Sequence, residues 1–208
     1  MINVSIAGIG GQGSVLAARI LAQAAEAKGW QVRSAETIGM AQRGGDVMSH
    51  VRMGNAGEEV FSPLPAKGTV DVLIALEPGE AARALPYLKE NGLLVVASTG
   101  IPPVMANFKR QTYDPQHLID DMQVAGVKMV VVDDAELVHR LGEPKALNVM
   151  MLAYAIIAVN KRQDCVDNAL RGAITLEDIE AAIPLCVKRK LVSVNEKAIK
   201  VVQQVARM

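Results

Sequence analysis

The sequence predicts one α/β domain over residues 1–208, a three-layer α/β/α Rossmann-like fold with a mixed, mostly parallel sheet and a helical C-terminal part. Strand-like apolar runs alternate with helix-like stretches as far as residue 133. Half of the residues are apolar but only 3% are aromatic, which is typical of aliphatic helices packed on a sheet. A length of 208 residues fits one domain with a sizeable core.

The first 36 residues read as a β-α-β unit. Asn3 to Ala7 is predicted to form a strand, and the glycine-rich loop after it leads into an Ala-rich helix from about Ser14 to Lys28. Gly29 is a natural helix stop. A second strand from Gln31 to Glu36 follows directly. This order is the opening of a doubly wound fold.

A strand is predicted next, at a point where the alternation of strands and helices would place a helix. Apolar and polar residues alternate from Val47 to Met53, and Asn55 to Gly57 reads as a turn. We expect Glu58 to Phe61 to return antiparallel and complete a hairpin. The sheet should therefore be mixed.

The rest of the chain resumes the alternation and then becomes helical. Asp114 can cap a helix that has Pro115 at its first position. The expected strands are 70–76, 93–98 and 128–133, and the expected helices are 78–90, 135–141, 145–159, 175–183 and 188–205.

The glycine loop carries the first candidate site. Gly8, Gly10 and Gly13 have the G-x-G-x-x-G spacing of dinucleotide-binding turns, with Glu36 placed where an acidic residue would hold a ribose hydroxyl. Gly11 and Gln12 add an exposed backbone N–H and an amide that we expect to project from the turn, which suit an anion or a polar partner surface. A stand-alone NAD(P)-binding oxidoreductase and a tight turn without ligand both remain open.

A second candidate site lies in the loop before the inserted strand. Arg43 is followed by Gly44 and Gly45, so a guanidinium stands beside backbone amides that no side chain covers. This combination suits phosphate or carboxylate. A bend in which Arg43 pairs with a carboxylate of the chain is the alternative.

No catalytic or metal-binding set is predicted. His50 has no second ligand at a suitable spacing, and Cys165 and Cys186 are too few for a four-cysteine site, so both are expected to be ordinary thiols. Asn148 is the lone polar residue early in an apolar helix. Its partner is expected to be a backbone carbonyl at a helix crossing, with a subunit or ligand as the alternative.

Charge and hydropathy exclude two classes of partner. Lys and Arg total 22, as do Asp and Glu, and this balance argues against nucleic acid. The apolar stretch 146–159 is shorter than the roughly 20 residues that a membrane-spanning helix needs. The chain opens on a strand-like run without a secretory signal, so a cytoplasmic location is expected.

The segments GIGGQGSVLAARIL (8–21) and SAETIGMAQRGGDVMSHVRMG (34–54) together resemble the gamma-type subunits and domains of the 2-oxoacid:ferredoxin oxidoreductases. GMAQRGG followed by SHVRMG is most similar to the small subunit of the indolepyruvate type. A looser resemblance runs through 70–88, 141–155 and 192–201, so it covers most of the chain.

The resemblance implies a subunit, inactive alone, of an enzyme that converts an aryl-pyruvate, coenzyme A and oxidised ferredoxin to an aryl-acetyl-CoA, CO2 and reduced ferredoxin. Thiamine diphosphate and [4Fe-4S] clusters would belong to a large partner subunit, and this chain would bind no cofactor tightly. Coenzyme A could contact Gly8, Gly10 to Gly13 and Arg43 to Gly45. A scaffold subunit without a nucleotide role stays open.

Overall fold

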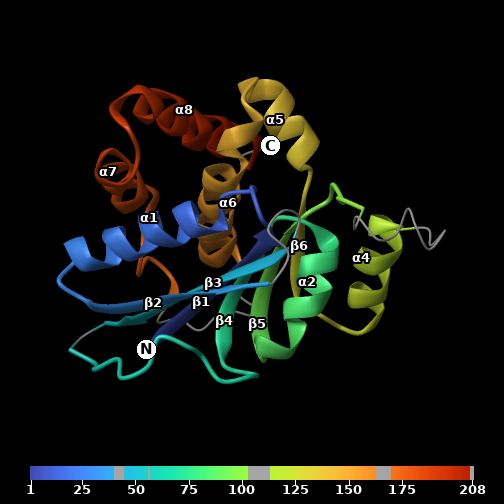
Figure 1. Ribbon diagram of the computed structural model, residues 1–208, viewed down its shortest axis with the longest axis horizontal. Coiled ribbons are helices and arrows are strands. Elements are labelled where there is room, and N and C mark those ends of the chain that lie inside the picture. Colours follow the sequence, from blue (N-terminus) through green and yellow to red (C-terminus); the bar gives the residue numbers. More distant parts are fainter. Residues whose placement is uncertain (40–44, 56, 103–112, 163–169, 207–208) are drawn as a thin grey trace.

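A computed structural model describes residues 1–39, 45–55, 57–102, 113–162 and 170–206. One central sheet lies between two layers of helices (Figure 1). Helices α1, α5, α6, α7 and α8 lie on one face, and α2 and α4 lie on the other (Figure 1). This arrangement confirms the predicted three-layer α/β/α class.

The sheet has six strands in the order β2-β3-β1-β4-β5-β6. They are β1 (Ile2–Ile9), β2 (Gln31–Ile38), β3 (Asp46–Gly54), β4 (Val70–Ala75), β5 (Leu88–Ala97) and β6 (Met129–Val132). β1, β4, β5 and β6 pair in parallel, whereas β3 runs antiparallel to both of its neighbours, β1 and β2. The mixed, mostly parallel sheet is thus confirmed.

The prediction that residues 58–61 would pair with the inserted strand was wrong. Residues 58–61 form no strand. β3 instead forms its hairpin with the preceding strand, β2, and its other edge pairs with β1. Because both edges of β3 are taken, no place is left for a returning strand from Glu58 to Phe61.

The helices follow the predicted pattern with one exception. They are α1 (Ser14–Ala27), α2 (Pro78–Ala84), α4 (Pro115–Val124), α5 (Asp134–Leu141), α6 (Leu147–Lys161), α7 (Leu176–Cys186) and α8 (Arg189–Val205), with short 3-10 turns at Leu85–Tyr87 and Pro144–Ala146. The helix expected over 78–90 ends at Ala84, because Pro86 lacks the N–H that would continue it. β5 begins soon afterwards, at Leu88.

Local sequence signals explain several boundaries. The Asp114 side chain accepts hydrogen bonds from the N–H groups of Gln116 and His117, with Pro115 at the first helical position of α4, as predicted. At the start of α7, Thr175 and Asp178 form a reciprocal capping box. These caps fix the first residues of α4 and α7.

The larger core lies between the sheet and the α1/α6 layer. α6 is central to it, and residues from Val149 to Ala153 are almost completely buried. Most of the apolar stretch 146–159 therefore packs inside this chain. Among the described residues, no helix is both long and apolar enough to cross a membrane.

Candidate functional site

The two predicted loops meet at the edge of the sheet where the parallel strands end. The glycine loop follows β1, and Gly45 lies just before β3, whose start is paired with the end of β1. The Gly10 N–H donates to the Gly45 carbonyl oxygen at 2.9 Å. The structure thus joins two of the predicted site residues, whereas Arg43 and Gly44 lie outside the described residues.

Gln12 turns inward instead of projecting from the loop. Its Oε1 accepts from the Ile9 N–H at 2.7 Å, and its Nε2 donates to the Leu76 carbonyl oxygen at 2.9 Å. The amide therefore links the end of β1 to the residue that follows β4. Glycine at position 8 favours this packing, because a Cβ there would lie 3.0 Å from Gln12 Oε1, a tight contact.

Gly13 is held against the start of α6. It has a φ of 86°, in the left-handed region, and its carbonyl oxygen accepts from Asn148 Nδ2 at 2.9 Å. This contact confirms the expected backbone partner for Asn148. The Asn148 Oδ1 atom is buried without a partner among the described residues.

The outward side of the glycine loop consists of backbone. Gly10 and Gly11 are exposed, and α1 begins at Ser14 without a side-chain cap. In the described part of the chain, the N–H groups of Gly11, Gly13 and Ser14 have no hydrogen-bond partner. Unpaired N–H groups at a helix N-terminus favour an anionic group.

An acidic cavity of about 160 Å³ lies on the α2 side of the same edge. Asp46, Glu77 and Glu80 contribute its carboxylates, and Arg83 forms an ion pair with Glu80 at 3.2 Å. Burial raises the pKa of Glu80, Arg83 lowers it, and the charges of Glu77 and Asp46 raise it. This side of the edge is therefore unfavourable for an anion.

The cavity also shows how α2 begins. Glu77 Oε1 accepts from the Glu80 N–H at 2.6 Å, and the Tyr113 hydroxyl donates to the other oxygen of Glu77 while accepting from the Gly79 N–H. Burial, followed by the hydrogen bond to Glu77, raises the pKa of Tyr113. The chain's own side chains thus satisfy the start of α2. Sequence analysis missed this cluster, although Glu77 before Pro78 is a recognisable helix start.

Glu36 does not lie beside the glycine loop. In a dinucleotide-binding fold, the strand that carries the ribose-binding carboxylate is the neighbour of the first strand. Here β3 lies between them, since Ser49 is paired with Ile6 on one side and with Glu36 on the other. Two strand spacings, about 10 Å, separate Glu36 from β1.

Polar residues away from this edge do not gather into a metal centre in the part of the chain that the structure describes. His50 is buried, and its Nδ1 lies 2.8 Å from the Ser5 hydroxyl, so burial lowers its pKa. Within the ranges that the structure describes, no three His, Cys, Asp or Glu side chains gather as metal ligands. Cys186 is a free, half-buried thiol, and Cys165 lies outside these ranges.

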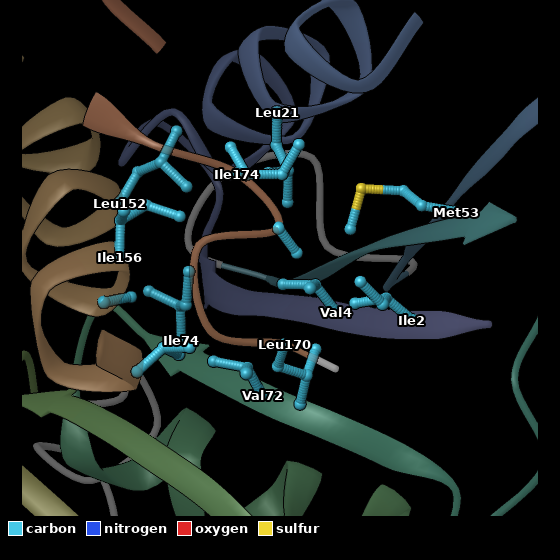
Figure 2. Close-up of a pocket in the computed structure, with 13 residues that line it drawn as sticks. Ile2, Val4, Leu21, Met53, Val72, Ile74, Leu152, Ile156, Leu170 and Ile174 are labelled. Carbon is cyan, nitrogen blue, oxygen red and sulfur yellow. The ribbon is translucent and has the colours of Figure 1, made fainter. Parts of the chain in front are cut away.

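A second cavity, between the sheet and α6, is apolar and small. Figure 2 shows side chains from several elements pointing into it, among them Val4, Ile74, Leu152 and Leu170. Its volume is about 40 Å³. An engineered cavity that takes up benzene has about 150 Å³, so this space cannot hold an aromatic substrate. It is a packing defect of the core.

Comparison with known proteins finds relatives that match almost the whole chain. The family model described as pyruvate ferredoxin/flavodoxin oxidoreductase matches residues 3–207. The indolepyruvate oxidoreductase subunit IorB of Archaeoglobus fulgidus is 32% identical over 200 residues, which are 96% of this chain and 92% of that protein. The IorB subunit of Thermococcus kodakarensis is 31% identical and covers 94% of this chain and 91% of its own length.

Solved structures share the fold. The gamma subunit of a keto/oxoacid ferredoxin oxidoreductase from Geobacter sulfurreducens superposes with a TM-score of 0.65 at 22% identity, covering 98% of this chain and 97% of its own. A 2-oxoglutarate:ferredoxin oxidoreductase chain from Magnetococcus marinus gives a TM-score of 0.70 at 15% identity. The match covers 99% of this chain but 31% of that one, so there the fold is part of a longer polypeptide.

Proposed function

Because the chain belongs to the pyruvate ferredoxin/flavodoxin oxidoreductase family, we propose that it is the small subunit of a 2-oxoacid:ferredoxin oxidoreductase of the indolepyruvate type. The complex converts an aryl-pyruvate, coenzyme A and oxidised ferredoxin to an aryl-acetyl-CoA, CO2 and reduced ferredoxin. The supporting observation is the match of nearly full length to IorB subunits at 32% and 31% identity. Pyruvate/ketoisovalerate gamma subunits match either over a shorter stretch, at 35% over 101 residues, or at lower identity, at 24% over 192 residues.

We assign the redox chemistry to a larger partner subunit. A [4Fe-4S] cluster takes four thiolates, and this chain has two cysteines in all. Within the described residues, no three His, Cys, Asp or Glu side chains gather as metal ligands either. We therefore place the clusters, and thiamine diphosphate with them, on the partner, and we expect the isolated small subunit to be inactive. The complex acts in the cytoplasm.

For this chain we propose a role in assembly and in the path of coenzyme A. The Gly10–Gly13 loop presents unpaired N–H groups, and the Gly45 carbonyl joins it to the loop that carries Arg43. An anionic coenzyme A would lie on this α1 side of the edge, because Glu77 and Glu80 occupy the α2 side. Its phosphates would be held by Gly11, Gly13 and Arg43.

Co-purification tests the assembly. The tagged chain is co-expressed with a candidate large subunit from the same genome, and the mass of the eluted species is measured with its iron and thiamine content. We expect a complex that contains the two chains in equal numbers and that also contains iron and thiamine. A chain that elutes alone, from cells in which the large subunit is soluble, contradicts the proposal.

Steady-state kinetics of the assembled complex test the coenzyme A path. Arg43→Ala should raise the KM for coenzyme A about tenfold or more, because a charge-assisted hydrogen bond is lost, and should leave the KM for the oxoacid unchanged. Arg83→Ala, across the edge in the acidic cavity, is the matched control and should leave both KM values unchanged. An unchanged KM for coenzyme A in Arg43→Ala would favour a scaffold subunit instead.

A further inference from the structure

The side-chain amide of Gln12 is inserted between the ends of two neighbouring parallel strands. The ladder between β1 and β4 is regular up to Ala7 and Ala75, and the Leu76 N–H donates to the Ala7 carbonyl oxygen at 2.8 Å. The next rung of a parallel ladder would join the Ile9 N–H directly to the Leu76 carbonyl. Both groups bind the Gln12 amide instead, at 2.7 and 2.9 Å. The amide thus acts as an extra peptide unit in the ladder.

This position is the topological switch point of the sheet. The chain leaves β1 for α1 on one face and leaves β4 for α2 on the other face (Figure 1). Doubly wound folds that bind dinucleotides place the ligand in the crevice that opens there. We propose that Gln12 is a built-in occupant of this crevice and determines its specificity: the space between the Ile9 N–H and the Leu76 carbonyl accepts a primary amide and rejects a dinucleotide pyrophosphate. The outward N–H groups of Gly11 and Gly13 lie outside this space and stay available to the phosphates of coenzyme A.

The chemistry of the crevice matches an amide and not a phosphate. Ile9 offers a donor and Leu76 an acceptor, and a primary amide carries one group for each. A pyrophosphate has only acceptors near neutral pH, so it could accept from Ile9 but would bring negative oxygen against the Leu76 carbonyl. The buried carboxylate of Glu77, the next residue, adds to this repulsion.

The side chains around the Gln12 amide are also tightly packed. A Cβ at Gly8 would lie 3.0 Å from Gln12 Oε1 and 3.0 Å from Leu76 Cδ1. Leu76 is only 1% exposed. A larger residue at Gly8 would therefore press on both Gln12 and Leu76, which favours glycine at the first position of the G-x-G-x-x-G pattern without a ligand.

Chemical rescue of the isolated full chain tests the proposal. Gln12→Ala removes Cγ and the amide, which are atom for atom an acetamide molecule. Acetamide should therefore bind the variant and lower its unfolding equilibrium constant about threefold at twice the dissociation constant. Acetate at equal concentration should not, because it cannot donate to Leu76. Gln12→Leu, which fills the space without hydrogen bonds, and the wild type are the controls, and neither should respond to acetamide.

Two results would overturn the proposal. The first is that acetamide and acetate have the same effect on Gln12→Ala; if that variant does not fold, equal refolding yields in the two solutes count the same way. The second is micromolar binding of NAD+ or NADP+ to the wild-type chain by calorimetry, where we expect none. Both measurements use this chain without a partner, so they are independent of its proposed role as a subunit.

Discussion

Replacing Gly13 by alanine should destabilise the fold far more than the same change at Gly11, two residues earlier. Both glycines have positive φ, 106° at Gly11 and 86° at Gly13, so an alanine costs about 1–2 kcal/mol at either position. At Gly11 a Cβ meets nothing within 4 Å, whereas at Gly13 it would lie 2.6 Å from Asn148 Nδ2. Asn148 must then move.

That movement breaks the 2.9 Å bond from Asn148 to the Gly13 carbonyl and leaves a buried donor unpaired, which costs a further 1–3 kcal/mol or so. We therefore expect losses in the free energy of unfolding of about 1–2 kcal/mol for Gly11→Ala and about 2–5 kcal/mol for Gly13→Ala.

Urea unfolding, followed by the fluorescence of the single tryptophan, Trp30, measures both losses. In a double-mutant cycle, Asn148→Ala should be less harmful in the Gly13→Ala background than alone, because the clash is removed with it. Equal losses for the two glycine variants, within about 0.5 kcal/mol, would refute the reasoning.

Three further predictions concern the body of the domain. Ser49→Ala should leave the free energy of unfolding unchanged or raise it by up to about 1 kcal/mol, because the Ser49 hydroxyl is buried without a partner among the described residues; a clear loss of free energy in urea unfolding would contradict this. Burial lowers the pKa of His50, so the unfolded state binds the proton more readily and stability should fall as the pH drops below 6.5, the ordinary pKa of a histidine; His50→Asn should flatten that slope in a pH series of melting temperatures. Ala155→Val should fill part of the 40 Å³ apolar cavity and gain at most about 1 kcal/mol in urea unfolding, whereas a loss would mean that the cavity has no room.

Local signals in the sequence were sufficient for most of the fold. Asp114 and Pro115 marked the start of α4, and the alternation from Val47 to Met53 marked the inserted strand. Pairing across the sheet was harder to predict, because a strand's partner is chosen by the whole sheet. For that reason β3 was recognised as a strand, but Glu58 to Phe61 was wrongly expected beside it.

The candidate site was predictable only in part for the same reason. Glycine spacing indicated the turn after β1, but the inward position of Gln12 depends on the Leu76 carbonyl, 64 residues away. The separation of Glu36 from β1 depends on the insertion of β3 between them. Both facts argue against the dinucleotide site that the G-x-G-x-x-G spacing alone would favour.

The role as a small subunit is tested most directly by reconstitution from separately purified chains. Reduction of ferredoxin is followed with coenzyme A and either indolepyruvate or pyruvate as the oxoacid, for each chain alone and for the two together. We predict no activity for this chain alone, little for the large subunit alone, and ferredoxin reduction by the mixture that is faster with indolepyruvate. Full activity of the large subunit without this chain would contradict the account.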